Sequence, residues 1–218
     1  MNFFAHYYFY NKPGEHWHNA GLLFPDLLRI FTHNQRITEK DIKGYKGVGP
    51  SHPLAEGIKY HFLADHIFHN WDWFKEKNHS LALSIRNSDH PLERDWFLAH
   101  IFIELAIDHV LVSQKESMVS DLYTDLAACN EKEWVEFFEE RKLSEAKIWY
   151  EGYKRFCEHR YIFTYKDTHN VIYALDRIYE RTGIGKFTDA QFGFLVVLLN
   201  DFIPEVKLKI LELRKLLE

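Results

Sequence analysis

The sequence predicts an all-α protein folded as a single helical bundle. Hydrophobic residues recur with helical periodicity nearly everywhere, strict alternation never extends beyond a few residues, and Asn-Gly or Asp-Gly hairpin signals are missing. A chain of 218 residues with 46% hydrophobic and 27% charged residues has the composition of a globular protein with a sizeable core. We therefore expect one domain over residues 1–218, in which residues 1–115 carry the functional site and residues 116–218 form a scaffold.

The first elements are short helices followed by a connection. We expect helices near residues 2–10 and 17–30, the second bent by Pro25. A polar connection over about 32–50 comes next, and its glycine-rich end, 44–50, contains three glycines and a proline. Such a segment could cradle a phosphate, but isolated glycine patterns are weak signals and a flexible loop is the better interpretation.

Two long helices complete the first half. A serine shortly ahead of Pro53 predicts the start of a helix over about 53–76, and a Ser-Asp pair ahead of Pro91 predicts another over about 91–115.

The second half has ordinary amphipathic helices with clear start signals. Asn130 with Glu133, and Thr188 with Gln191, have the spacing of a capping box. The expected helices lie near residues 118–129, 131–141, 144–160, 168–182 and 188–217, the last interrupted around Pro204.

Charge and cysteine content exclude several classes of protein. A net charge of −5 and an isoelectric point near 6.3 argue against a nucleic-acid binder held by phosphate contacts. The two cysteines form no C-x-x-C pair, and the N-terminal residues lack the basic region of a signal peptide. The longest purely apolar run near the C-terminus, 194–199, is too short to span a bilayer. We expect a soluble cytoplasmic protein without nucleic-acid or membrane partners, in an oligomeric state that the sequence leaves open.

Histidines are concentrated in one part of the chain. The chain has 14 histidines, and twelve of them fall within the first 109 residues. Such a distribution indicates a localised site in that half. Four histidines in polar stretches (His16, His18, His33 and His79) are expected at the surface.

The helix expected over 91–115 carries a polar stripe. Between residues 96 and 112 every side chain is apolar except His100, Glu104, Asp108 and His109. The first three are spaced i, i+4 and i+8, so they follow one side of a helix that is apolar elsewhere and therefore buried. Buried carboxylates need a compensating partner, and the segment contains no lysine or arginine.

A matching stripe lies on the preceding long helix. His61, Asp65 and His69 have the same i, i+4, i+8 spacing among apolar neighbours. Imidazole and carboxylate side chains suit a divalent ion such as manganese, iron or zinc. Eight residues of helix rise about 12 Å, far more than two bonds of about 2 Å, so the stripes imply two ions, or one ion with a separate substrate end. The alternative is a buried histidine–carboxylate network without metal.

Three residues near the N-terminus add to this picture. His6 stands alone in an apolar segment, where a core histidine is the ordinary interpretation. Asp26 follows Pro25 and fits a helix cap as well as a ligand. Arg29 can hold a phosphate with two hydrogen bonds, or neutralise a nearby acid.

These positions together resemble the bacterial acyl carrier protein phosphodiesterase family. The match covers roughly residues 1–112 in order and spacing, although each motif alone is weak. The motifs are Met1-Asn-Phe-Phe-Ala-His6, Leu22-Leu-Phe-Pro-Asp26-Leu-Leu-Arg29, Gly57-Ile-Lys-Tyr-His61-Phe-Leu-Ala-Asp65 and Glu104-Leu-Ala-Ile-Asp108-His109.

The resemblance implies a fold, an activity and a set of ligands. The family is all-helical, distantly related to the HD phosphohydrolases, and uses a divalent metal, typically manganese, to release 4′-phosphopantetheine from the carrier-protein serine. By resemblance, this chain is expected to hold one or two ions between its long helices. The residues expected to bind or surround the metal are His6, Asp26, His61, Asp65 and Asp108, with Glu104 adjoining.

This chain departs from the family pattern at His69, His100 and Glu104. The additional imidazoles favour zinc or iron over manganese. An acidic carrier protein as substrate also calls for a basic patch. Only two segments could supply it, one with Lys40, Lys43 and Lys46 and one with Arg141, Lys142 and Lys147.

The leading hypothesis is therefore a metal-dependent phosphodiesterase. We expect His69 or His100 to transfer protons, Arg29 to hold a phosphate oxygen, and His66 and His109 to support the ligands. The alternatives are a metal hydrolase acting on another small phosphoester or amide, and a non-catalytic helical protein with a buried polar network.

Overall fold

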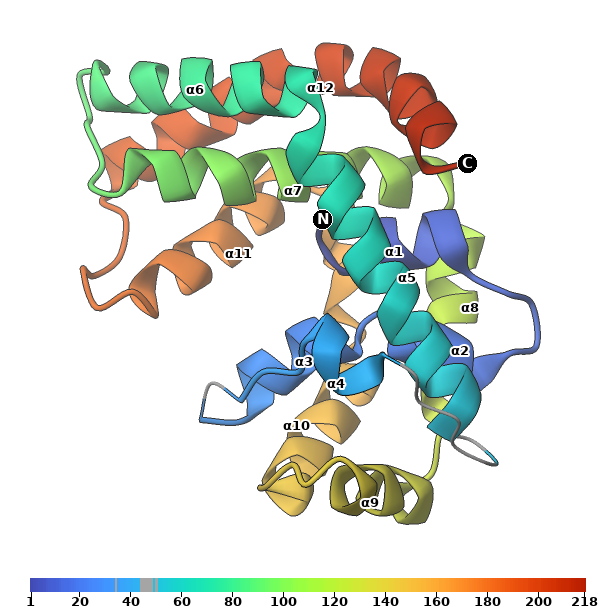
Figure 1. The fold of residues 1–218 in the computed structure, drawn as a ribbon. Helices are drawn as coiled ribbons and strands as arrows, with labels where there is room; N and C mark the ends of the chain where they lie inside the picture. The colour runs from blue at the N-terminus through green and yellow to red at the C-terminus, as the bar shows by residue number, and fades with distance from the viewer. Residues whose placement is uncertain (34, 44–48, 50) are drawn as a thin grey trace. The chain divides into compact units, whose positions relative to one another are not determined.

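The structure is a computed structural model that describes residues 1–33, 35–43, 49 and 51–218. Every regular element within these ranges is helical, which confirms the predicted all-α class (Figure 1). The chain forms two compact units that interleave along the sequence. The first unit contains Met1–Asn2, His66–Lys115 and Ile162–Glu218, and the second contains Phe3–Asp65 and Glu116–Tyr161. A single domain over residues 1–218 stays a prediction.

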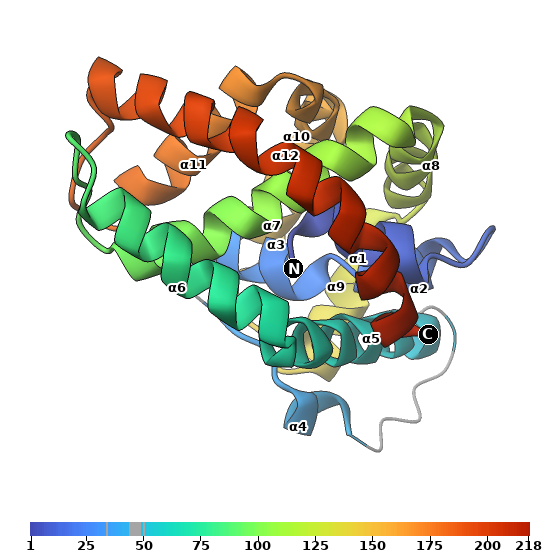
Figure 2. The same cartoon turned by 90° about the horizontal axis from the view of Figure 1, so that it is seen from above.

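The first unit is organised around α7 (Asp95–Gln114). Helices α6 (Asp72–Arg86), α11 (Thr168–Glu180) and α12 (Asp189–Leu217) all contact α7. In Figure 2, α12 crosses α7, and α6 lies at an angle against the N-terminal part of α7. Because neighbours cover α7 on several sides, nearly all of its side chains from residue 98 to 112 are buried, as the apolar sequence predicts.

The length and composition of α7 would also allow it to cross a membrane, and it is the one such helix found within the described ranges. However, 72% of its most apolar window is buried inside the protein. This burial is typical of the core helix of a soluble protein, and a cytoplasmic location stays a prediction.

The long helix expected over 53–76 is two helices. Helix α5 (Ser51–Asn70) ends before Trp71, whose extended backbone begins α6. The Trp71 indole donates a hydrogen bond to Glu212 Oε1 at 2.9 Å, and the Trp73 indole donates to Glu205 Oε1 at 2.8 Å. These bonds fix both indoles against α12, which explains why the helix breaks between α5 and α6 without a proline or glycine. Sequence periodicity predicts neither this break nor the part of α6 beyond residue 76.

The start predicted for α7 is also four residues early. Residues 93 and 94 form a turn, and Arg94 adopts a left-handed backbone conformation immediately before the helix.

The second unit packs short helices from both ends of its sequence. Helix α1 (Phe3–Tyr10) and helix α2 (His16–Gly21) contact α8 (Glu116–Ala127), while α3 (Phe24–Phe31) contacts α10 (Ala146–His159). The remaining helices of this unit are α4 (Glu39–Ile42), α9 (Glu131–Glu140) and the N-terminal part of α5.

The helix predicted over 17–30 is divided into α2 and α3. The break falls at Leu22 and Leu23 rather than at Pro25, which lies in the first turn of α3. Proline is well tolerated in a first turn because its missing N–H would have no helical partner there. The predicted connection contains α4, while residues 44–48 and 50 of its glycine-rich end lie outside the described residues.

Aromatic side chains fill the core of the second unit. Phe24 stacks on Trp134 with ring centroids 5.4 Å apart, and Trp134 contacts Trp149 at 4.5 Å. All three side chains are fully buried. They fix α3 against α9 and α10 and contribute through both burial and ring geometry.

Two glycines allow α2 and α5 to approach closely. A Cβ atom on Gly57 would lie 2.0 Å from the carbonyl oxygen of His18, and one on Gly21 would lie 2.3 Å from that of Leu54. Only glycine fits at such distances. The contact places α5 beside the α2–α3 connection. The part of α5 that belongs to this unit ends at Asp65.

The expected helices of the second half are confirmed to within about two residues. Asn130 and Thr188 cap their helices with the predicted side-chain bonds. The predicted interruption at Pro204 is wrong, because α12 continues through it. Pro204 and Asn200 are both exposed, so water can solvate the carbonyl that loses its helical hydrogen bond. The 3₁₀ helix η1 (Tyr161–Lys166) was not anticipated.

Candidate metal sites

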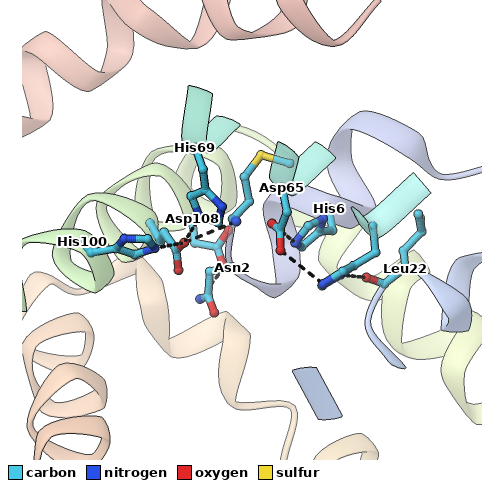
Figure 3. Close-up of polar contacts among 10 residues, drawn as sticks. Asn2, His6, Leu22, Asp65, His69, His100 and Asp108 are labelled. Atoms are coloured by element: carbon cyan, nitrogen blue, oxygen red, sulfur yellow. Dashed lines mark hydrogen bonds and ion pairs between the residues drawn. The ribbon is translucent and has the colours of Figure 1, made fainter. Parts of the chain in front are cut away.

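Two clusters of histidine and carboxylate side chains occur among the described residues, one in each unit. We call the cluster of the second unit, His6, His61 and Asp65, the His6 group. The cluster of the first unit, His69, His100 and Glu104, is the His100 group. In each, the three potential ligand atoms lie within 4.8 Å of one another (Figure 3).

In the His6 group, the Asp65 carboxylate lies between two imidazoles. Oδ1 is 3.3 Å from His6 Nε2, and Oδ2 is 3.5 Å from His61 Nε2. The two rings stack with centroids 4.0 Å apart. The imidazoles are buried, with side-chain exposures of 0% for His6 and 3% for His61, whereas Asp65 is 29% exposed. Solvent therefore reaches the group from the carboxylate side.

The other ring nitrogen of His61 defines its tautomer. His61 Nδ1 lies 2.9 Å from the carbonyl oxygen of Leu22, and since a carbonyl only accepts, Nδ1 carries a hydrogen. If the ring is neutral, Nε2 presents a lone pair to the Asp65 carboxylate. An acceptor facing an acceptor is unfavourable unless a cation, either a proton or a metal ion, lies between them.

Electrostatics in the His6 group favour neutral imidazole beside an ionised carboxylate. Burial, together with the neighbouring His61 ring, lowers the pKa of His6 to about 3. Burial alone would raise the pKa of Asp65, but the two imidazoles help to hold it below its usual range. Neutral imidazole and carboxylate are the forms that bind a metal.

The His100 group converges on one oxygen atom. Glu104 Oε1 is 3.0 Å from His100 Nε2 and 3.4 Å from His69 Nε2. The Glu104 side chain is only 10% exposed, but those of His69 and His100 are 37% and 30% exposed. This group therefore has a buried carboxylate and two imidazoles that solvent reaches.

The amino group of Met1 also contacts the same carboxylate oxygen, at 3.3 Å. Burial alone would raise the pKa of Glu104, but this amino group and the two imidazoles hold it below its usual range. Nearby, Asn2 donates a hydrogen bond to the fully buried Asp108, at 2.8 Å. The carboxylates predicted to be buried on α7 therefore have polar partners in the first unit.

Comparison with known protein families, curated proteins and solved structures finds no match to this chain. The interpretation of both groups therefore depends on their geometry and on the sequence motifs.

The structure brings together only part of the predicted ligand set. His6, His61 and Asp65 meet as the sequence predicts, and Glu104 is joined by His69 and His100, for which the sequence predicts proton transfer instead. Asp26 and Asp108 belong to neither cluster. Asp26 is half-buried in the first turn of α3, whose N-cap is Leu23, so the alternative interpretation of Asp26 as the helix cap is wrong.

The predicted supporting residues His66 and His109 are members of neither group. Arg29 and His66 are exposed. His109 is buried, and its Nδ1 bonds to the carbonyl oxygen of Tyr165 at 2.6 Å, while burial lowers its pKa. The supporting contact that the structure does show, the Leu22 carbonyl on His61, is a backbone atom, so no side-chain pattern could have indicated it.

One surface expectation is wrong. His18 is buried, its Nε2 lying 3.0 Å from the carbonyl oxygen of Tyr10. The polar residues next to His18 in the sequence predict an exposed side chain. They give no sign that His18 lies at the close contact between α2 and α5.

Proposed function

We propose that this protein is a divalent-metal-dependent phosphodiester hydrolase whose metal centre is the His6 group. The observation that carries the proposal is the tautomer of His61. Its Nδ1–H donates to the carbonyl oxygen of Leu22, so in the neutral ring the nitrogen facing an Asp65 oxygen, 3.5 Å away, is the one with a lone pair, Nε2. A backbone carbonyl that orients the second nitrogen of a histidine is a common feature of metal-binding histidines.

The donor set fits a manganese, iron or zinc ion. Two imidazole nitrogens and one carboxylate leave coordination positions for water and substrate. A bound divalent ion supplies a Lewis acid for a phosphoryl oxygen and lowers the pKa of a coordinated water.

The protein's own residues hold that arrangement in place. Burial keeps His6 neutral, and the Leu22 carbonyl fixes the ring of His61. Asp65, the most exposed of the three ligands, marks the side from which substrate approaches. Proton transfer by His69 and His100 is not part of this proposal, because both rings are directed at Glu104.

The resemblance to acyl carrier protein phosphodiesterases supports 4′-phosphopantetheine on a carrier protein as the substrate. Two segments predicted to offer basic residues contact one another, since Arg141 Nη1 donates to the Asp41 carbonyl at 3.0 Å. Lys40, Lys43 and Lys142 are exposed in these segments, while Lys46 lies outside the described residues. A different small phosphoester is the alternative substrate.

The non-catalytic alternative also has an observation in its favour. Each oxygen of Asp65 already faces an imidazole, so a proton shared with His61 would complete the network without metal. That network would bind no metal ion, and the shared proton would stabilise it instead.

The test is hydrolysis by metal-free protein to which manganese, iron(II) or zinc is restored. The substrates are holo-acyl carrier protein and bis(p-nitrophenyl) phosphate. We expect hydrolysis only with metal, and loss of both metal and hydrolysis in Asp65→Asn. Asp72→Asn, which removes an exposed carboxylate on α6, is the matched control and should behave as wild type.

Absence of hydrolysis on both substrates, from protein that retains its metal, would overturn the proposed activity. Equal hydrolysis by wild type and Asp65→Asn would overturn the proposed site.

A further inference from the structure

The His100 group is not used by the proposed activity. Its ligands come from two helices of the first unit, His69 from α5 and His100 and Glu104 from α7. We propose that this group is a second, separate metal site that binds a zinc-class transition-metal ion in exchange with solvent. The inference is independent of the proposed hydrolysis and requires no substrate.

Three potential ligand atoms converge in the His100 group. Both Nε2 atoms lie within 3.4 Å of Glu104 Oε1, and all three ligand atoms lie within 4.8 Å of one another. Ligands at about 2.0–2.2 Å from a tetrahedral zinc ion are separated by little more than 3 Å. Small side-chain rotations would therefore bring these atoms around one ion.

An aromatic side chain orients the two imidazoles of the His100 group. The Phe74 ring lies edge-on to His100, with centroids 5.1 Å apart, and also contacts His69 at 5.6 Å. Phe74 is buried, so it forms a fixed wall beside both rings. Restricting the rings before binding reduces the entropy that a metal ion must overcome.

The ligand types of the His100 group select the class of ion. Two imidazoles and one carboxylate favour zinc, iron or cobalt over magnesium and calcium, which prefer oxygen ligands. Because the two rings are about a third exposed and the Met1 amino group competes for Glu104 Oε1, we expect an ion here to exchange readily.

The experiment titrates metal-free protein, without a polyhistidine tag, with Co²⁺ as an optical substitute for zinc. Visible absorption reports nitrogen ligation, and equilibrium dialysis gives the stoichiometry. We expect wild type to bind about two equivalents, one per three-ligand group, with the weaker removed quickly by a chelator. His100→Ala should lose the more weakly bound ion and retain the other. The Co²⁺ affinity of the His100 group should fall by more than the roughly 10–100-fold that is typical of removing a residue that only supports a metal ligand.

The matched control is His52→Ala, which removes an exposed imidazole from the same helix, α5. It should bind as wild type does. If His100→Ala does not fold, judged by circular dichroism, Glu104→Gln decides, because glutamine preserves the size of the side chain. Retention of the weaker equivalent in the folded variant, or its loss in His52→Ala, would overturn this site. A variant of the His6 group that loses only the more tightly bound ion tests the proposed function and leaves the second site unaffected.

Discussion

In the His6 group both imidazoles are buried and stacked, whereas in the His100 group they are about a third exposed. The ligand types are the same, two histidines and one carboxylate. The groups also differ in what holds them. A backbone carbonyl fixes the His61 ring, while a buried phenylalanine lies against His69 and His100.

This difference teaches that similar ligand sets can have different affinities. A ligand whose second nitrogen is hydrogen-bonded has its tautomer and direction decided before metal arrives. Aromatic packing limits the position of a ring but does not choose its tautomer. We therefore expect the His6 group to retain an ion and the His100 group to exchange one.

The largest effect is expected for His61→Ala. Removing this ring deletes a ligand and leaves the Asp65 carboxylate with one imidazole partner fewer. Metal affinity of the His6 group should fall by more than about 100-fold, while Co²⁺ binding at the His100 group stays unchanged. Calorimetric titration measures both. An equal loss of metal affinity at both groups would show that they are one coupled site rather than two separate sites.

The next largest effect is expected for Asp125→Ala, within the second unit. Asp125 is buried on α8 and accepts hydrogen bonds from Tyr7 at 2.8 Å and Asn19 at 2.7 Å, with His16 Nδ1 at 2.6 Å. Removing it leaves buried donors without an acceptor, which costs about 3–5 kcal/mol in free energy of unfolding.

Tyr7 lies next to His6 on α1, so this variant should also weaken metal binding by the His6 group alone. Urea unfolding and metal titration test both effects. Asp121→Ala, an exposed carboxylate on the same helix, should be nearly neutral, and a comparable loss in that variant would contradict the account.

A smaller effect is expected for Gly57→Ala. The new methyl group would meet the His18 carbonyl at 2.0 Å and push α5 away from α2. Overpacking of this kind costs about 1–3 kcal/mol and shifts His61, one turn further along α5. Gly193→Ala on α12, where nothing lies within 4 Å, is the control and should be neutral or slightly stabilising. Unchanged metal affinity in a destabilised Gly57→Ala would argue against the link between this crossing and the His6 group.

The smallest effect is a pH dependence from His18. Burial lowers the pKa of His18, and the nearby charged groups are Lys12, Glu15 and Glu56. Because the folded pKa is below the unfolded value of about 6.5, the contribution of this histidine is complete above that pH and is lost as pH falls.

His18→Gln should therefore lose less stability than wild type between pH 7.5 and pH 5. Urea unfolding at the two pH values measures the difference, with exposed His90→Gln as control. An unchanged slope would mean that His18 is not held neutral in the folded state.

The sequence predicted the all-α class and most helix positions because amphipathic periodicity and caps are local signals. It missed the break at Trp71 and the division between α2 and α3, which depend on contacts with distant segments, namely the indole bonds to α12 and the close approach of Gly57. It also predicted an interruption at Pro204, where exposure of the helix makes the lost hydrogen bond inexpensive.

For the candidate site, i, i+4 spacing identified the polar stripes but not how their members are grouped. His61 and Asp65 join His6, whereas His69 joins His100 and Glu104. The rise of about 12 Å over eight helical residues predicts that His61 and His69 do not share one ion, which agrees with these clusters. Spacing along one helix cannot show which residue of another helix completes each group.

The central claim, that the His6 group binds a divalent metal, is tested most directly by the metal content of untagged protein. Wild type and His61→Ala are incubated with manganese, iron(II) and zinc in turn, passed through gel filtration, and measured by plasma mass spectrometry. We expect wild type to retain about one equivalent, the number that a single three-ligand group holds, and His61→Ala to retain almost none. Wild-type protein that retains no ion after any incubation would contradict the claim and would leave the group as a buried hydrogen-bonded network.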